Sequence, residues 1–178
     1  ASANVLLPKI TTDVLGLGET AYGWLSASQA IGAGLAAVVI SQLKEIKRQG
    51  RVFLVSVMIF GAATALFGFA RSFWTAALFL VLIGASDSVS TIIRNTIRQL
   101  QTPDRLRGRM VSVNQMFFMG GPQLGEIEAG AAAQAFGVPF AVVSGGVACI
   151  LAVSWVARRW PELRTYNGDE PAAAGAAG

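Results

Sequence analysis

Long apolar stretches constrain the fold of this chain more than any other feature. A helix that crosses a bilayer needs about 20 mostly apolar residues, because each residue adds about 1.5 Å of length. Only 13% of the 178 residues are charged, against about 25% in an average soluble domain. We therefore predict an all-α integral membrane protein rather than a soluble bundle, which would need amphipathic helices. Five stretches of spanning length lie at 22–43, 52–70, 74–97, 110–135 and 138–157.

The positive charges are distributed unevenly among the junctions between these spans. Of the 14 Lys and Arg residues, all but Lys9 and Arg71 lie at or after the ends of the first, third and fifth spans. Lys and Arg accumulate on the cytoplasmic side of membrane proteins. The first span is therefore predicted to run inward, and residues 158–178 are predicted to form a cytoplasmic tail. Because the charges lie in short loops rather than on one face, the net charge of +4 does not indicate nucleic-acid binding.

Missing residue types exclude several kinds of chemistry. The chain has no histidine and a single cysteine, Cys149. The sequence thus offers no Ser/His triad, no histidine-ligated metal and no disulfide framework. We predict neither enzyme activity nor a bound cofactor or metal. Residues 1–10 are too short to span a membrane, and we expect them to be the end of a truncated membrane helix.

Several short motifs lie in the second half of the chain. They read "QLQTPDRLRGRMVSVN" at 99–114, "QLGEIEAG" at 123–130, "GG" at 145–146 and "PELR" at 161–164. Together they resemble the C-terminal half of a major facilitator superfamily transporter, in the bacterial branch that includes the enterobactin exporter and drug-efflux proteins. The resemblance covers nearly the whole chain. It implies that residues 1–10 end family helix seven, that the five spans are helices eight to twelve, and that an N-terminal half is missing.

The resemblance also implies gating residues in the cytoplasmic loops. The family's loop after helix eight reads G-x-x-x-D-x-x-G-R, whereas Ser41 and Glu45 here replace the glycine and aspartate, and the Gly-Arg pair ending at Arg51 is displaced. Arg51 is still a candidate gating residue. The remaining candidates lie in the next inner loop and are Asp104, Arg107, Gly108 and Arg109.

A polar stripe in the third span is the first candidate for a substrate or proton pathway. Asp or Arg at the centre of a membrane helix costs about 2.5 to 3.5 kcal/mol, so such residues face protein or a wet cavity. Asp87 and Arg94 lie on one helix face. The stripe comprises Asp87, Ser90, Thr91, Arg94, Arg98 and Gln101. Asp87 is expected to bind a proton or a cationic group, and Arg94 to hold an anion or act as a gate. The alternative is that Asp87 bonds a neighbouring helix and Arg94 reaches the headgroups.

The fourth span supplies the second candidate face. Its segment "GGPQLGEIEAG" at 120–130 contains Glu126 and Glu128, which point about 200° apart around a helix. Glu126 shares a face with Gln115, and Gln123 lies at the edge of that face, so these three are predicted to line a cavity. A hydrogen bond between helices is the alternative for Glu126. Glu128 falls beside a Gly-x-x-x-Gly pair and is predicted to lie at a helix contact or the outer interface.

With the resemblance, these observations predict a secondary active transporter in the bacterial inner membrane. It would export an amphipathic small molecule, such as a drug or siderophore, by alternating access. The expected partners are this small molecule, protons exchanged by antiport, the lipid bilayer and the missing N-terminal half; no nucleic acid is expected. The alternative is a non-catalytic membrane subunit or scaffold of a multi-component permease.

Overall fold

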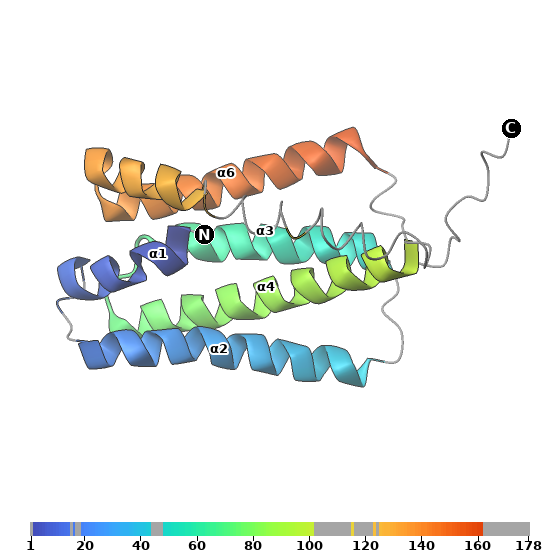
Figure 1. Cartoon of the computed structure of the whole chain (residues 1–178), viewed down its shortest axis with the longest axis horizontal. Helices are drawn as coiled ribbons and strands as arrows, with labels where there is room; N and C mark the ends of the chain where they lie inside the picture. The colour runs from blue at the N-terminus through green and yellow to red at the C-terminus, as the bar shows by residue number, and fades with distance from the viewer. Residues whose placement is uncertain are drawn as a thin grey trace, which may run out of the picture.

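The computed structural model describes residues 2–14, 16, 19–43, 48–101, 115, 123 and 125–161. Every regular element in these ranges is helical. The elements in chain order are α1 (Ser2–Lys9), the π-helical turn η1 (Ile10–Val14), α2 (Glu19–Gln42), α3 (Gln49–Phe67), α4 (Phe73–Gln101) and α6 (Val138–Arg159), as Figure 1 shows. Residues 125–136 are helical as well.

Four of these helices are long and apolar enough to cross a membrane. Their spanning parts are Thr20–Gln42, Gln49–Phe67, Phe73–Ile97 and Val138–Arg159. The prediction of an all-α membrane fold is therefore confirmed. These four helices lie where spans were expected at 22–43, 52–70, 74–97 and 138–157. Most of the span expected at 110–135 lies outside the described residues.

The four long helices lie side by side, with α4 and α3 in the middle. α4 packs against both α2 and α3, and α3 packs against α6. The chain reverses direction between α2 and α3 and again between α3 and α4, so that α2 and α4 run parallel (Figure 1). The last residues of α2, α4 and α6 therefore lie at the same end of the bundle as the first residue of α3. We call this the α4 C-terminal end.

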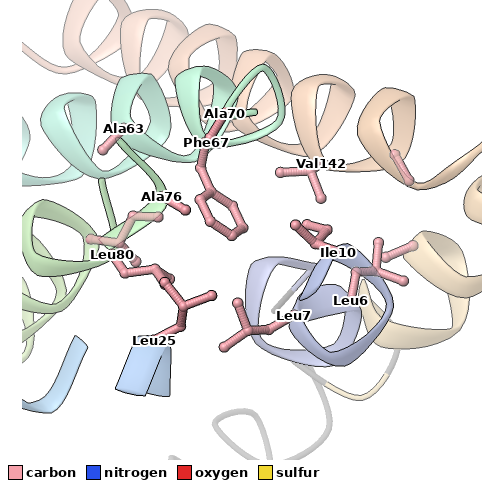
Figure 2. Close-up of a cluster of buried hydrophobic side chains, with 13 residues drawn as sticks. Leu6, Leu7, Ile10, Leu25, Ala63, Phe67, Ala70, Ala76, Leu80 and Val142 are labelled. Atoms are coloured by element: carbon pink, nitrogen blue, oxygen red, sulfur yellow. The ribbon is translucent and has the colours of Figure 1, made fainter. Parts of the chain in front are cut away.

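A buried apolar cluster occupies the opposite end of the bundle. Leu6, Leu7 and Ile10, from α1 and η1, lie between side chains of all four long helices (Figure 2). The partners at its centre are Leu25, Phe67, Leu80 and Val142. Pro8 lies inside α1 and has no N–H to donate to the preceding turn. The π-helical turn follows directly, and the Thr11 hydroxyl donates to the Leu7 carbonyl oxygen over 2.8 Å.

Glycines allow the backbones of α2 and α4 to touch. A Cβ added at Gly32 would overlap the carbonyl of Val81, and a Cβ added at Gly84 would overlap the carbonyl of Gln29. Each glycine thus faces the carbonyl that lies three residues before the other glycine. Small residues at membrane helix contacts let backbones approach in this way and permit Cα–H···O contacts.

A second glycine pair joins α3 to α6. A Cβ added at Gly146 would lie 2.6 Å from the Gly61 carbonyl oxygen and 2.5 Å from the Ala65 nitrogen. One turn away, a Cβ at Gly68 would lie 2.6 Å from a methyl carbon of Val143. The contact between α3 and α6 is therefore closely packed at these glycines.

Candidate functional site

One face of α4 changes from apolar to polar at Asp87. Towards the start of the helix, this face carries Ala76, Leu80 and Ile83, which are buried by the apolar cluster. From Asp87 onward the same face is polar, and both Asp87 and Arg94 are exposed. Asp87 lies midway along the 29 residues of α4. The expected polar stripe is thus exposed at Asp87 and Arg94 and partly exposed at Thr91, whereas Ser90 is buried.

Local hydrogen bonds hold the smaller polar side chains of this stripe. The Ser90 hydroxyl donates to the Asp87 carbonyl oxygen over 3.0 Å, and Arg94 Nη2 donates to Thr91 Oγ1 over 3.5 Å. By contrast, the Asp87 carboxylate forms no hydrogen bond or ion pair with any residue that the structure describes. The structure therefore places Asp87, Thr91 and Arg94 on a surface that is at least partly exposed, with Ser90 buried, and leaves the Asp87 carboxylate available to a ligand. The side chains of Arg98 and Gln101 lie outside the described residues.

Gln29 of α2 borders the same site, although the sequence alone had not assigned it a role there. Its Cγ lies 3.1 Å from where a Gly84 Cβ would be, and its side chain is partly exposed. The chain contains one signal that could have found it. The tripeptide Ile-Gly-Ala occurs at 31–33 and again at 83–85, and these two copies meet at the crossing of α2 and α4.

The two glutamates of the fourth expected span differ in exposure. Glu126 is partly buried and Glu128 is exposed. Ala129 joins the apolar cluster and lies about 60° from Glu126 around the helix, so Glu126 flanks the face that packs inward. Gln115 and Gln123 are exposed helical residues. Within the described residues, no hydrogen bond or ion pair connects Glu126 to Asp87.

Only one of the expected gating residues lies in the described part of the chain. Arg51 is exposed in the first turn of α3, and its backbone N–H donates to the Arg48 carbonyl oxygen over 3.0 Å. Asp104, Arg107, Gly108 and Arg109 lie outside the described residues, as does the expected tail beyond position 161.

The described residues contain no group of three His, Cys, Asp or Glu side chains that could hold a metal ion. Cys149 instead lies at the contact between α6 and α3, with its Sγ 4.0 Å from the Val57 carbonyl oxygen. The arrangement around Asp87 is suited to binding a ligand, because the exposed Asp87 carboxylate and the partly exposed Gln29 amide lie near the same helix crossing.

Membrane-length helices joined through glycine contacts, with an exposed carboxylate midway along one of them, define a polytopic membrane protein. Residues 1–173 match the family described as transmembrane secretion effector. The chain belongs to this family of major facilitator superfamily transporters.

Curated proteins similar to the chain include enterobactin exporters. The chain is 29% identical over 110 residues to the enterobactin exporter EntS of Shigella flexneri, covering 62% of this chain and 27% of that protein. It is 35% identical over 89 residues to enterobactin exporter EntS of Salmonella choleraesuis (strain SC-B67), covering 49% of this chain and 21% of that protein. The chain thus spans about a quarter of the length of these relatives. No solved structure matches the chain.

Proposed function

We propose that this chain is the C-terminal half of a secondary active transporter that exports an amphipathic small molecule by alternating access. The observation that carries this proposal is the polar stripe that begins at Asp87, midway along α4, and exposes Asp87 and Arg94. Transporters of this architecture bind their substrate near the middle of the membrane, between two halves that rock about it. Both enterobactin exporters named above are similar to this chain, which favours export and keeps siderophores, beside drugs, among the substrate classes.

Asp87 is the group that we propose to couple transport to protons. The described parts of the neighbouring helices carry few ionisable groups: Glu19 and Tyr22 lie near the start of α2, and Arg51 lies near the start of α3. On α4 itself, Arg94 lies about 10 Å further along the axis. A carboxylate with no close counterion in a membrane gains from binding either a proton or a cationic ligand. Competition between the two would produce proton antiport.

Arg94 and the face of Glu126 would complete the pathway. We propose that Arg94 holds an anionic group or acts as a gate, and that Glu126, Gln115 and Gln123 line the cavity. Gating by Arg51 and by the loop residues Asp104, Arg107, Gly108 and Arg109 belongs to the same proposal.

The proposed orientation places the α4 C-terminal end in the cytoplasm of a bacterial cell, with the protein in the inner membrane. Arg158 and Arg159 lie in the last turn of α6, and Arg48 and Arg51 lie beside the start of α3 at the same end of the bundle. This distribution agrees with the excess of positive charge on the cytoplasmic side of membrane proteins.

The proposal is tested by measuring efflux with the full-length protein at several external pH values, using a panel of cationic dyes and siderophores. Asp87→Asn is expected to reduce efflux of the transported compound by about tenfold or more, because hydrogen bonds to charged groups are among the stronger ones, and to flatten the pH dependence. Glu126→Gln is expected to weaken efflux less. Glu128→Gln is the matched control and should behave as wild type.

Two results would contradict parts of this proposal. Normal efflux with unchanged pH dependence in both Asp87→Asn and Glu126→Gln would rule out the proton-coupling role. Absence of export of every compound, with export appearing only when another membrane component is added, would favour the scaffold alternative.

A further inference from the structure

The crossing of α2 and α4 brings Gln29 close to Asp87. Because the two helices run parallel, and Gly32 and Gly84 face each other's backbones, their register is determined at this point. Gln29 then lies against Gly84, with the Gln29 Cγ 3.1 Å from the position that a Cβ on residue 84 would take. Asp87 is three residues beyond Gly84, and Cβ atoms at that spacing are about 5 to 6 Å apart. The amide and the carboxylate therefore border one short stretch of α4.

Helix geometry places both side chains on the same side of this crossing. Gln29 precedes Gly32 by three residues and Asp87 follows Gly84 by three, so each is rotated by about 60° from the contact, in opposite senses. For parallel helices that face each other, opposite rotations lead to the same side of the interface. Leu7 packs beside Leu25, in the buried cluster that also contains Leu80 (Figure 2).

The opposite side of the crossing has a different character. The large side chains there are exposed and apolar, as expected for a surface in contact with lipid. They include Ile31 and Leu35 of α2 and Leu78 and Leu82 of α4. The polar pair thus lies on the side that faces the rest of the bundle.

Burial changes along this side of the two helices. Near their first residues, Leu25 and Leu80 are buried in the apolar cluster with Leu7 of α1. Further along, Gln29 is partly exposed and Asp87 is exposed. Within the described part of the chain, neither side chain makes a hydrogen bond. Ala33 and Ala37, on the same side of α2, add little bulk below Gln29.

We infer that Gln29 and Asp87 form a two-helix binding site for an amphipathic substrate with a cationic nitrogen and a nearby hydrogen-bonding group. This inference rests on the proposed transport function. The Asp87 carboxylate binds the cationic nitrogen, and the Gln29 amide, which both donates and accepts hydrogen bonds, binds the second polar group. The surrounding leucine and alanine side chains contact the apolar part of the substrate. Gln29 is therefore a specificity-determining residue, and Gly84 provides the space in which its side chain lies.

The test uses the full-length transporter, with ethidium as the cationic probe and Nile red as the neutral one. Gln29→Ala is expected to raise the apparent KM for ethidium efflux by about three- to tenfold, which is the contribution of one neutral hydrogen bond, while the maximal rate changes little. Gln29→Glu is expected to lower this KM by adding a second carboxylate, and to leave Nile red efflux nearly unchanged. The matched control is Ser28→Ala, because the Ser28 hydroxyl donates to the Trp24 carbonyl of its own helix over 2.8 Å.

Equilibrium binding of ethidium to the purified wild-type protein separates this inference from the proposed function. In one outcome, the wild type binds and exports ethidium, and Gln29→Ala and Gln29→Glu change the Kd and KM for ethidium no more than Ser28→Ala does. The two-helix site is then wrong, and the transporter proposal stands. If the wild type neither binds nor exports any probe or siderophore, both proposals fail.

Discussion

At the scale of single residues, buried hydroxyl groups in the helices are usually satisfied by the carbonyl one turn earlier. Thr11 donates to Leu7 in this way, and Ser56 donates to Val52, each over 2.8 Å. Thr64 of α3 is different. It is 3% exposed, and its Oγ1 has no hydrogen-bond partner in the described structure. An unsatisfied buried hydroxyl costs about 1 to 3 kcal/mol.

Replacing these threonines by valine should therefore have opposite effects. Thr64→Val is expected to stabilise the fold by about 1 kcal/mol, because it removes a polar atom that has no partner. Thr11→Val is expected to destabilise it by about 1 kcal/mol, because it deletes an existing hydrogen bond. Thermal unfolding of the detergent-solubilised full-length protein measures both. A lower midpoint for Thr64→Val than for wild type would show that its hydroxyl is in fact satisfied.

At the scale of helices, two glycines two positions apart on α2 provide a direct comparison. A Cβ at Gly32 would overlap the α4 backbone at Val81, whereas a Cβ at Gly34 would meet nothing within 4 Å. Gly34→Ala is expected to stabilise the helix by up to about 1 kcal/mol. Gly32→Ala is expected to destabilise the protein by about 1 to 3 kcal/mol through overpacking, and to impair ethidium efflux by separating Gln29 from Asp87. Unfolding midpoints and efflux rates of the two variants check this, and equal behaviour would contradict the close crossing.

At the scale of the whole molecule, the tryptophans lie near the two ends of the bundle. Trp24 and Trp74 are 70% and 79% exposed near the starts of α2 and α4. Trp155 and Trp160 stack edge to face at the end of α6, with ring centroids 5.7 Å apart, and the Arg159 guanidinium lies 5.6 Å from the Trp160 ring. Tryptophan at such positions anchors membrane helices at the headgroup level.

Fluorescence quenching should report this arrangement. In a full-length protein whose other tryptophans are replaced by phenylalanine, lipids brominated near the headgroup are expected to quench more strongly than lipids brominated near the terminal methyl group. Trp155→Phe should leave this depth preference unchanged, because the remaining rings lie at the same two levels. Stronger quenching by the deeply brominated lipids would contradict the proposed membrane position of the bundle.

The membrane fold could be predicted because length and apolar composition act locally. An uninterrupted apolar stretch such as 138–157 satisfies its own backbone hydrogen bonds as a helix, whatever its neighbours are. The same holds for the stripe that joins Asp87 to Arg94, since it follows from the helical period alone. The roles of Asp87, Arg94 and Glu126 remain predictions, because a role depends on the substrate as well as on position.

The sequence by itself therefore determined that the four described spans are apolar helices of membrane length. It also determined the helix face on which each polar residue lies. The tertiary structure alone decided which faces meet. Gln29 is an ordinary polar residue in an apolar span until Gly32 and Gly84 bring α2 against α4 and place it beside Asp87. Contacts of this kind depend on helix register and crossing, which arise from packing between residues distant in the chain. For the same reason, only the packed helices show that Leu25 and Leu80 are buried together with Leu7, whereas Asp87 is exposed.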